Sequence, residues 1–79
     1  MRFVFSPHFT RSYAKAPPAV QRTFDKQSLL LLQDLRHPSI RAKKYEGEKW
    51  QGRVNRDWRF YFFIQGDVYY LVDIIPHPK

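Results

Sequence analysis

The chain has 79 residues and no cysteine, so it has the length of one small domain that lacks both disulfides and thiolate metal ligands. Its 14 Lys and Arg residues against 7 Asp and Glu residues give a net charge of +7, which favours a polyanionic partner. No apolar run approaches the roughly 20 residues that span a bilayer, and the N-terminus has no apolar signal-peptide centre, so we expect a cytoplasmic protein without a membrane partner.

The N-terminal segment combines a strand signal with a helix start. Residues 2–5, Arg-Phe-Val-Phe, predict a short strand. Ser6 follows as a favourable N-cap residue, and Pro7 occupies the position that proline prefers at the first helical residue. We therefore expect a helix from Pro7 through about Ala14.

A second helix is predicted after the Pro17-Pro18 pair. Its apolar residues recur at helical spacing. The predicted core stripe consists of Val20, Phe24, Leu31, Leu32 and Leu35. The run of four leucines at 29–32 is wider than one stripe requires, so we expect Leu29 or Leu30 to lie outside the core. The helix should end near His37-Pro38, because proline disfavours helical geometry in the residue before it.

The C-terminal half reads as strands joined by short turns. Residues 43–45 precede a turn at residues 46–48, and residues 50–56 alternate imperfectly. Residues 58–64 are almost wholly aromatic, and after a Gly-Asp turn residues 68–75 predict the last strand. The predicted order is β-α-α-β-β-β, with a helical hairpin packed on a small, mainly antiparallel sheet. The whole chain, 1–79, is then a single α+β domain.

The histidines do not form a metal site by their spacing. His8, His37 and His77 lie far apart in the sequence, and no acidic cluster accompanies them. The sequence also has no glycine-rich phosphate loop. We therefore expect neither a catalytic metal nor a cofactor.

Cations interleave with aromatic residues in the C-terminal half. Such a surface suits single-stranded nucleic acid, because phosphates meet the cations and unstacked bases lie on the rings. The candidate RNA-binding residues are Lys43, Lys44, Lys49, Arg56, Trp58 and Tyr61. A plainer interpretation is also open, in which the aromatic rings form the core of the small sheet and the lysines are a solvated edge.

A surface of this kind can cleave RNA without a metal. The 2′-hydroxyl attacks the adjacent phosphate, which requires a base, an acid and cations for the developing charge. Arg53 and Arg59 are candidates for the charge and His77 for the acid. Glu46 and Glu48 are the nearest carboxylates for the base, with a nearby lysine as the other option. Alternatively, Arg59 pairs with Asp73 across the last hairpin and His77 is an ordinary surface residue.

The same residues carry a family resemblance. Residues 50–64, WQGRVNRDWRFYFFI, and residues 74–77, IIPH, resemble the C-terminal half of toxins of the RelE/ParE superfamily, and Lys44-Tyr-Glu-Gly47 resembles their Lys-apolar-x-Gly segment. The resemblance covers essentially the whole chain. It implies a RelE-like fold and the toxin of a type II toxin–antitoxin system, an endoribonuclease of the RelE/YoeB-like branch. The implied partners are a cognate antitoxin protein, messenger RNA and the ribosome, with no small-molecule cofactor.

The resemblance also assigns roles to residues. Arg59 matches the arginine that contacts the scissile phosphate, and Arg53 matches a basic position of the site. His77 matches the general acid of YoeB-like members. Lys43 and Glu46 fall near the segment that provides the base or a supporting lysine.

Two positions depart from the family pattern. Pro78 stands where many active members have a tyrosine, and Gln51 stands where RelE-like members have a second lysine. Two other functions therefore stay open: a ParE-like toxin that inhibits gyrase, and an RNA-binding toxin domain that has lost catalysis.

Overall fold

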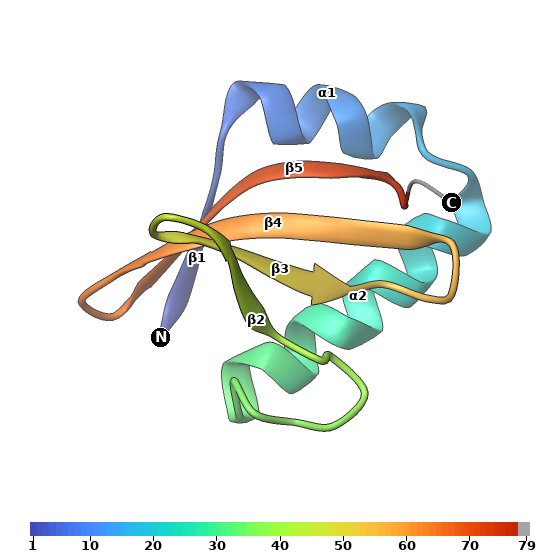
Figure 1. Cartoon of the computed structure of the whole chain (residues 1–79). Helices are drawn as coiled ribbons and strands as arrows, with labels where there is room; N and C mark the ends of the chain where they lie inside the picture. The colour runs from blue at the N-terminus through green and yellow to red at the C-terminus, as the bar shows by residue number, and fades with distance from the viewer. Residues whose placement is uncertain (78–79) are drawn as a thin grey trace.

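The computed structural model describes residues 1–77, which form one five-stranded sheet and two helices (Figure 1). The elements are β1 (Arg2–Phe5), α1 (Pro7–Lys15), α2 (Pro18–Gln33), β2 (Lys43–Glu46), β3 (Lys49–Arg53), β4 (Trp58–Gln65) and β5 (Val68–Pro76). The strand order is β1-β5-β4-β3-β2, in which β1 is parallel to β5 and the other pairs are antiparallel. The predicted α+β class is confirmed, with one strand more than predicted, because β2 pairs with β3.

The predicted helix starts are confirmed. The Ser6 side chain accepts a hydrogen bond from the Phe9 backbone N–H at 3.0 Å, as an N-cap residue does. Pro7 and Pro18 each open a helix, where the missing N–H of proline has no helical partner to lose. The first helix ends at Lys15, and α1 runs along β5 (Figure 1).

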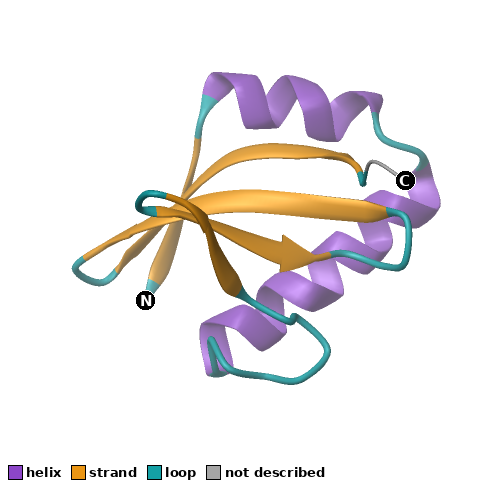
Figure 2. Ribbon diagram, in the orientation of Figure 1, coloured by secondary structure: helices purple, strands orange, loops and turns teal. Residues whose placement is uncertain are grey.

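The predicted end of the second helix, near His37-Pro38, is wrong. Helix α2 ends at Gln33, and Asp34 is extended with φ −160° and ψ 111°. Asp34 starts a turn, because its carboxylate accepts from the Arg36 backbone N–H at 2.9 Å and its carbonyl accepts from the His37 N–H at 3.0 Å. These local hydrogen bonds compete with the helix before proline can end it. The long loop that follows leads to β2 (Figure 2).

The core is an aromatic cluster between the helices and one face of the sheet. Phe24 of α2 lies edge-on to Phe60 of β4, with ring centroids 5.2 Å apart, and it also contacts Phe9 of α1 at 5.3 Å. Both Phe60 and Phe62 are 0% exposed. Trp58 is partly buried and packs against this cluster, as the plainer interpretation of the aromatic residues predicted.

Only part of the predicted helix stripe is buried. Leu31 is fully buried with Val20 and Phe24, whereas Leu32, which was predicted to be in the core, is exposed. The expectation for the leucine run is confirmed by Leu29, which is 62% exposed. The buried stripe continues instead through a polar residue, Gln27.

Two turns and one loop set the lengths of the later strands. The β2–β3 and β4–β5 turns each have a glycine at positive φ, Gly47 at 56° and Gly66 at 57°, which is the conformation that such tight hairpins demand. The predicted end of β3, at residue 56, is wrong, because this strand ends at Arg53. The Asn55 side chain ends it by accepting from the N–H groups of Asp57 and Trp58 at 2.8 and 2.9 Å.

Alternation along β4 gives the sheet two different faces. Phe60 and Phe62 point to the helices, so Arg59 and Tyr61 belong to the opposite face, which we call the open face. A register shift after Tyr61 places this tyrosine opposite Asp73 of β5. Within residues 1–77, neither helix has the length and apolar character needed to cross a membrane.

Candidate functional site

A hollow of about 190 Å³ lies on the open face, and we call it the basic pocket. Its lining residues are Arg41, Lys43, Gln51, Gly52, Arg53, Arg59 and His77. Strand pairing explains how they meet: Arg53 is the direct cross-strand partner of Arg59, and Gln51 pairs with Lys43. Four cations therefore line one small hollow, and no carboxylate lines it among the residues that the structure describes.

Like charges that face each other across two strands repel. Arg53 and Arg59 are both half-buried, so water screens this repulsion less than it does at an exposed site. The pKa of Arg59 is held below its ordinary value first by burial and then by the positive charge of Arg53. An anion in the basic pocket would offset the repulsion between the two arginines and the lowering of the Arg59 pKa. A phosphate group is an anion that arginines bind well.

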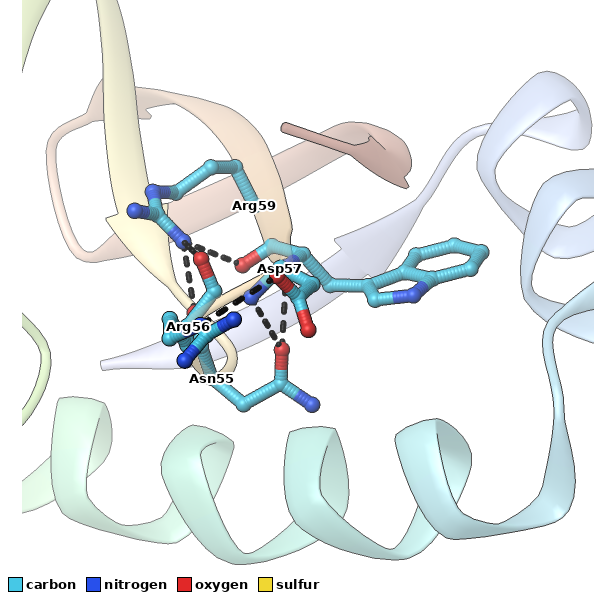
Figure 3. A network of polar contacts seen from close by, with 5 residues as sticks. Asn55, Arg56, Asp57 and Arg59 are labelled. Atoms are coloured by element: carbon cyan, nitrogen blue, oxygen red, sulfur yellow. Dashed lines mark hydrogen bonds and ion pairs between the residues drawn. The ribbon is translucent and has the colours of Figure 1, made fainter. Parts of the chain in front are cut away.

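The guanidinium of Arg59 is held in place by the β3–β4 loop. Its Nη1 atom donates to the carbonyl oxygens of Asn55 at 2.6 Å, Trp58 at 2.9 Å and Arg56 at 3.3 Å (Figure 3). One terminal nitrogen is thus fixed by the backbone, which orients the planar group. The loop that ends β3 therefore also positions the central arginine.

The alternative in which Arg59 pairs with Asp73 is wrong. Arg59 lies opposite Ile75 in the sheet, because the two-residue hairpin and the register shift after Tyr61 together fix the pairing. Asp73 lies opposite Tyr61, and its carboxylate is 3.3 Å from Nε2 of His8 at the start of α1. Within residues 1–77, no acidic side chain forms an ion pair with Arg59, and the charge of Asp57 offsets only part of the lowering of its pKa.

His77 reaches the basic pocket from the end of β5. Its backbone N–H donates to the Asp57 carbonyl at 2.7 Å, which joins the end of β5 to the β3–β4 loop. The His77 side chain is exposed and lines the pocket with both arginines. Of the two residues that depart from the family pattern, Gln51 lines the basic pocket, and Pro78 lies outside the described residues.

Arg41 lines the basic pocket; it is one of the cations that interleave with aromatic residues in the C-terminal half, but the sequence assigned it no role in the site. Its φ is 50°, in the left-handed region that residues other than glycine seldom adopt. The neighbouring Ile40 is fully buried, and its carbonyl accepts from the Arg53 N–H at 2.7 Å. This anchor turns the chain into β2 with Arg41 at the pocket. No sequence motif marks Arg41, whose place depends on this turn.

Gln27 of α2 supports the strand end that carries Arg53, a role that the sequence did not predict. It is 5% exposed, and its Nε2 donates to the carbonyls of Ser39 at 2.9 Å and Arg53 at 2.7 Å. The side chain therefore connects α2 to the strand end that carries Arg53. The only signal in the sequence is a polar residue at a helical position between Phe24 and Leu31.

The remaining candidates lie outside the basic pocket. Glu46, Lys49 and Tyr61 line a second hollow of the open face. Lys44 forms an ion pair with Glu48, with Nζ 3.5 Å from Oε2. In the exposed β3–β4 loop, Nε of Arg56 lies 3.6 Å from Oδ1 of Asp57. The structure thus brings Arg53, Arg59, His77 and Lys43 together but places Glu46, the predicted base, elsewhere. Among residues 1–77, no group of three His, Asp or Glu side chains is arranged to bind a metal ion.

Comparison with known proteins shows the fold. No family model matches the chain, and no curated protein matches it. A solved YoeB/ParE toxin from Agrobacterium tumefaciens is similar with a TM-score of 0.81 over 99% of this chain and 100% of its own, at 12% identity. YafQ from Escherichia coli strain BL21(DE3) is similar with a TM-score of 0.79 over 95% of this chain and 91% of its own, at 12% identity.

A third similar structure is the toxin–antitoxin complex RelBE2 from Mycobacterium tuberculosis. Its TM-score is 0.75 over 96% of this chain and 96% of the matched chain, at 13% identity. The chain therefore has the fold of the RelE, YoeB and YafQ toxins, as the resemblance in its sequence predicted.

Proposed function

We propose that this protein is the toxin of a type II toxin–antitoxin system and that it cleaves messenger RNA without a metal ion. The observation that carries the proposal is the basic pocket, where Arg53, Arg59 and His77 meet on a RelE-like sheet. Its partners are a cognate antitoxin, messenger RNA and the ribosome, and it acts in the cytoplasm. The antitoxin is expected to carry negative charge, because this chain carries +7.

The reaction is an in-line attack of a ribose 2′-oxygen on the adjacent phosphorus. A P–O2′ bond forms, the P–O5′ bond breaks, and the products are a 2′,3′-cyclic phosphate and a 5′-hydroxyl. Arg53 and Arg59 stabilise the extra negative charge on the phosphate oxygens in the transition state. Since the backbone already orients Arg59, little reorganisation is required when the charge develops.

The two protons are handled by separate groups. His77 gives a proton to the leaving 5′-oxygen, because a protonated imidazole that lines the basic pocket can act as a general acid. The 2′-hydroxyl proton is accepted by Lys43, because Lys43 lines the basic pocket and Glu46 does not. Lys43 thus replaces Glu46 as the proposed base.

The test is induced expression of the wild type beside His77→Ala, with mapping of cellular RNA ends that carry a 5′-hydroxyl. The matched control is His37→Ala, which removes a histidine that does not line the basic pocket. We expect new cuts within translated messages in wild type and in the control, and none with His77→Ala.

Other outcomes would lead to different functions. Growth inhibition without new RNA ends, accompanied by a DNA-damage response, would replace the ribonuclease with a gyrase inhibitor. A folded wild type that neither inhibits growth nor cuts RNA in the absence of an antitoxin would indicate a binding domain. Cuts that persist in His77→Ala would remove His77 from the role of acid.

A further inference from the structure

The second hollow of the open face has a volume of about 280 Å³ and has no role in the proposed cleavage. We call it the aromatic hollow. Its lining includes Tyr45, Glu46, Lys49, Tyr61, Asp73 and Ile75. It lies next to the basic pocket, because Tyr61 pairs across the strands with Gln51, which lines that pocket. A ligand can therefore extend from one hollow into the other.

The hydroxyl of Tyr61 is a polar group built into this hollow. The side chain is only 6% exposed, yet within residues 1–77 the hydroxyl forms no hydrogen bond with another residue. No fully enclosed side-chain nitrogen or oxygen of the described residues lacks a partner, so the hydroxyl must be reachable from outside. Since Tyr61 lines the aromatic hollow, its hydroxyl is available to a ligand there.

Tyr45 supplies an exposed ring at the same place. Its ring centroid is 5.2 Å from that of Tyr61, with the planes at 62°, and Tyr45 is 55% exposed. An edge-on pair with one exposed ring leaves a π-face available for a flat partner. Nucleobases stack on such rings, and this stacking contributes to binding.

The hydrogen-bonding groups of the hollow include two carboxylates. Asp73 is partly buried, and its Oδ1 accepts from the Ile74 N–H at 2.9 Å and lies 3.3 Å from His8, which orient the group. Glu46 provides the other. Carboxylates accept hydrogen bonds from the exocyclic amino groups of bases. Adenine, cytosine and guanine have such a group, whereas uracil does not.

The position along β4 agrees with a nucleotide that spans both hollows. Arg59 and Tyr61 are two residues apart on the same face, which corresponds to roughly 7 Å along a strand. A phosphate held by Arg59 thus leaves its attached nucleoside close to Tyr61.

We propose that the aromatic hollow binds the base next to the phosphate in the basic pocket, and that it selects bases with an exocyclic amino group over uracil. This inference rests on the proposed function, because it takes RNA as the substrate. Tyr61 and Asp73 act in it as specificity-determining residues, while the basic pocket supplies the phosphate contacts that every sequence shares.

The experiment measures binding of fluorescein-labelled 2′-O-methyl hexanucleotides of A, C and U by anisotropy, since these oligomers cannot be cleaved by 2′-oxygen attack. We expect wild type to bind the A and C oligomers about tenfold more tightly than the U oligomer. Tyr61→Phe removes only the hydroxyl, and Asp73→Asn removes the carboxylate charge and replaces one acceptor oxygen with an NH2 donor. Each should shrink the preference to about twofold and leave the affinity for U unchanged.

The control is Tyr70→Phe, which changes a partly exposed tyrosine that lines neither hollow and should keep the full preference. Equal binding of the three oligomers by wild type, or an unchanged preference in Tyr61→Phe, would overturn the inference. If the protein shows a base preference but makes no cuts in cells, the proposed ribonuclease activity would be rejected and the proposed base site would be retained. Cuts in cells without any preference would remove the base site alone.

Discussion

The two faces of the sheet are stabilised by different interactions, although the same strands build both. On the helix side, Phe60 and Phe62 are fully buried, and the face is held by contact between aromatic rings. On the open side, Arg59 and Tyr61 alternate with them, and the arginine is held by backbone carbonyls of a loop. The difference teaches that fold stability and the proposed activity depend on neighbouring residues of one strand, so single substitutions in β4 should separate them.

The largest expected effect tests the helix side. Phe60→Ala should lower the free energy of unfolding by about 3–5 kcal/mol, because it removes a fully buried ring from a small core. The measurement is urea unfolding followed by circular dichroism. The matched control is Phe63→Ala, a partly buried phenylalanine three residues further along β4, for which we expect about 1 kcal/mol. Equal losses in both variants would contradict the division between the faces.

The second prediction concerns the open side. Arg59→Lys should reduce messenger-RNA cleavage about 100-fold and leave the unfolding curve nearly unchanged. Lysine retains the charge, but its ammonium cannot hold the loop carbonyls and a phosphate in a fixed fork. The assay is cleavage in a cell-free translation reaction, with the exposed Arg56→Lys as control. Full activity of Arg59→Lys would show that charge alone is sufficient.

The third prediction tests the connection between the faces. Gln27→Leu should lower the free energy of unfolding by about 1–3 kcal/mol, since it leaves the carbonyls of Ser39 and Arg53 without the buried donor that they now share. Gln33→Leu, at the exposed end of the same helix, is the control. If urea unfolding gives the same stability for Gln27→Leu and wild type, the contact with Arg53 is not a structural support.

The smallest expected effect is the response of stability to alkaline pH. Burial, and after it the charge of Asp34, raises the pKa of Tyr69 above its ordinary value of 10.0. The folded state therefore holds this proton more tightly than the unfolded state. The contribution of the Tyr69 hydroxyl to stability is fully present below pH 10.0 and is lost as pH rises through the folded pKa. Between about pH 9 and pH 11 the free energy of unfolding should fall less steeply in Tyr69→Phe than in wild type. Parallel declines would contradict this assignment.

Local signals predicted the helix starts and the fold class. Ser6-Pro7 and Pro17-Pro18 determine the backbone geometry of the next few residues, so they predict the helix starts. The aromatic strands predict a buried sheet face, because each ring buries a large apolar area. The resemblance in residues 50–64 and 74–77 then predicted the fold that the solved toxins share. The residues grouped at the basic pocket, Arg53, Arg59 and His77, were also identified from the sequence.

The rest depended on contacts that a single sequence does not encode locally. Arg41 reaches the basic pocket through a left-handed turn, and Glu46 lies outside it because of where β2 pairs. The end of α2 was missed because the side chain of Asp34 competes with the helix. The aromatic hollow requires the register of β4 and β5, which is shifted after Tyr61 and cannot be read from alternation alone.

The pairing of β1 with β5 has a consequence for how the chain folds. The side chain of Ser6 contacts the carbonyl of Val72 across 66 positions, and the strands beside them pair in parallel. Strands β2 to β5 are joined by short connections and can form early, whereas β1 must await almost the whole domain. Until then its phenylalanines are exposed, so the newly made N-terminal segment is the part of this molecule most open to aggregation and to capture by chaperones.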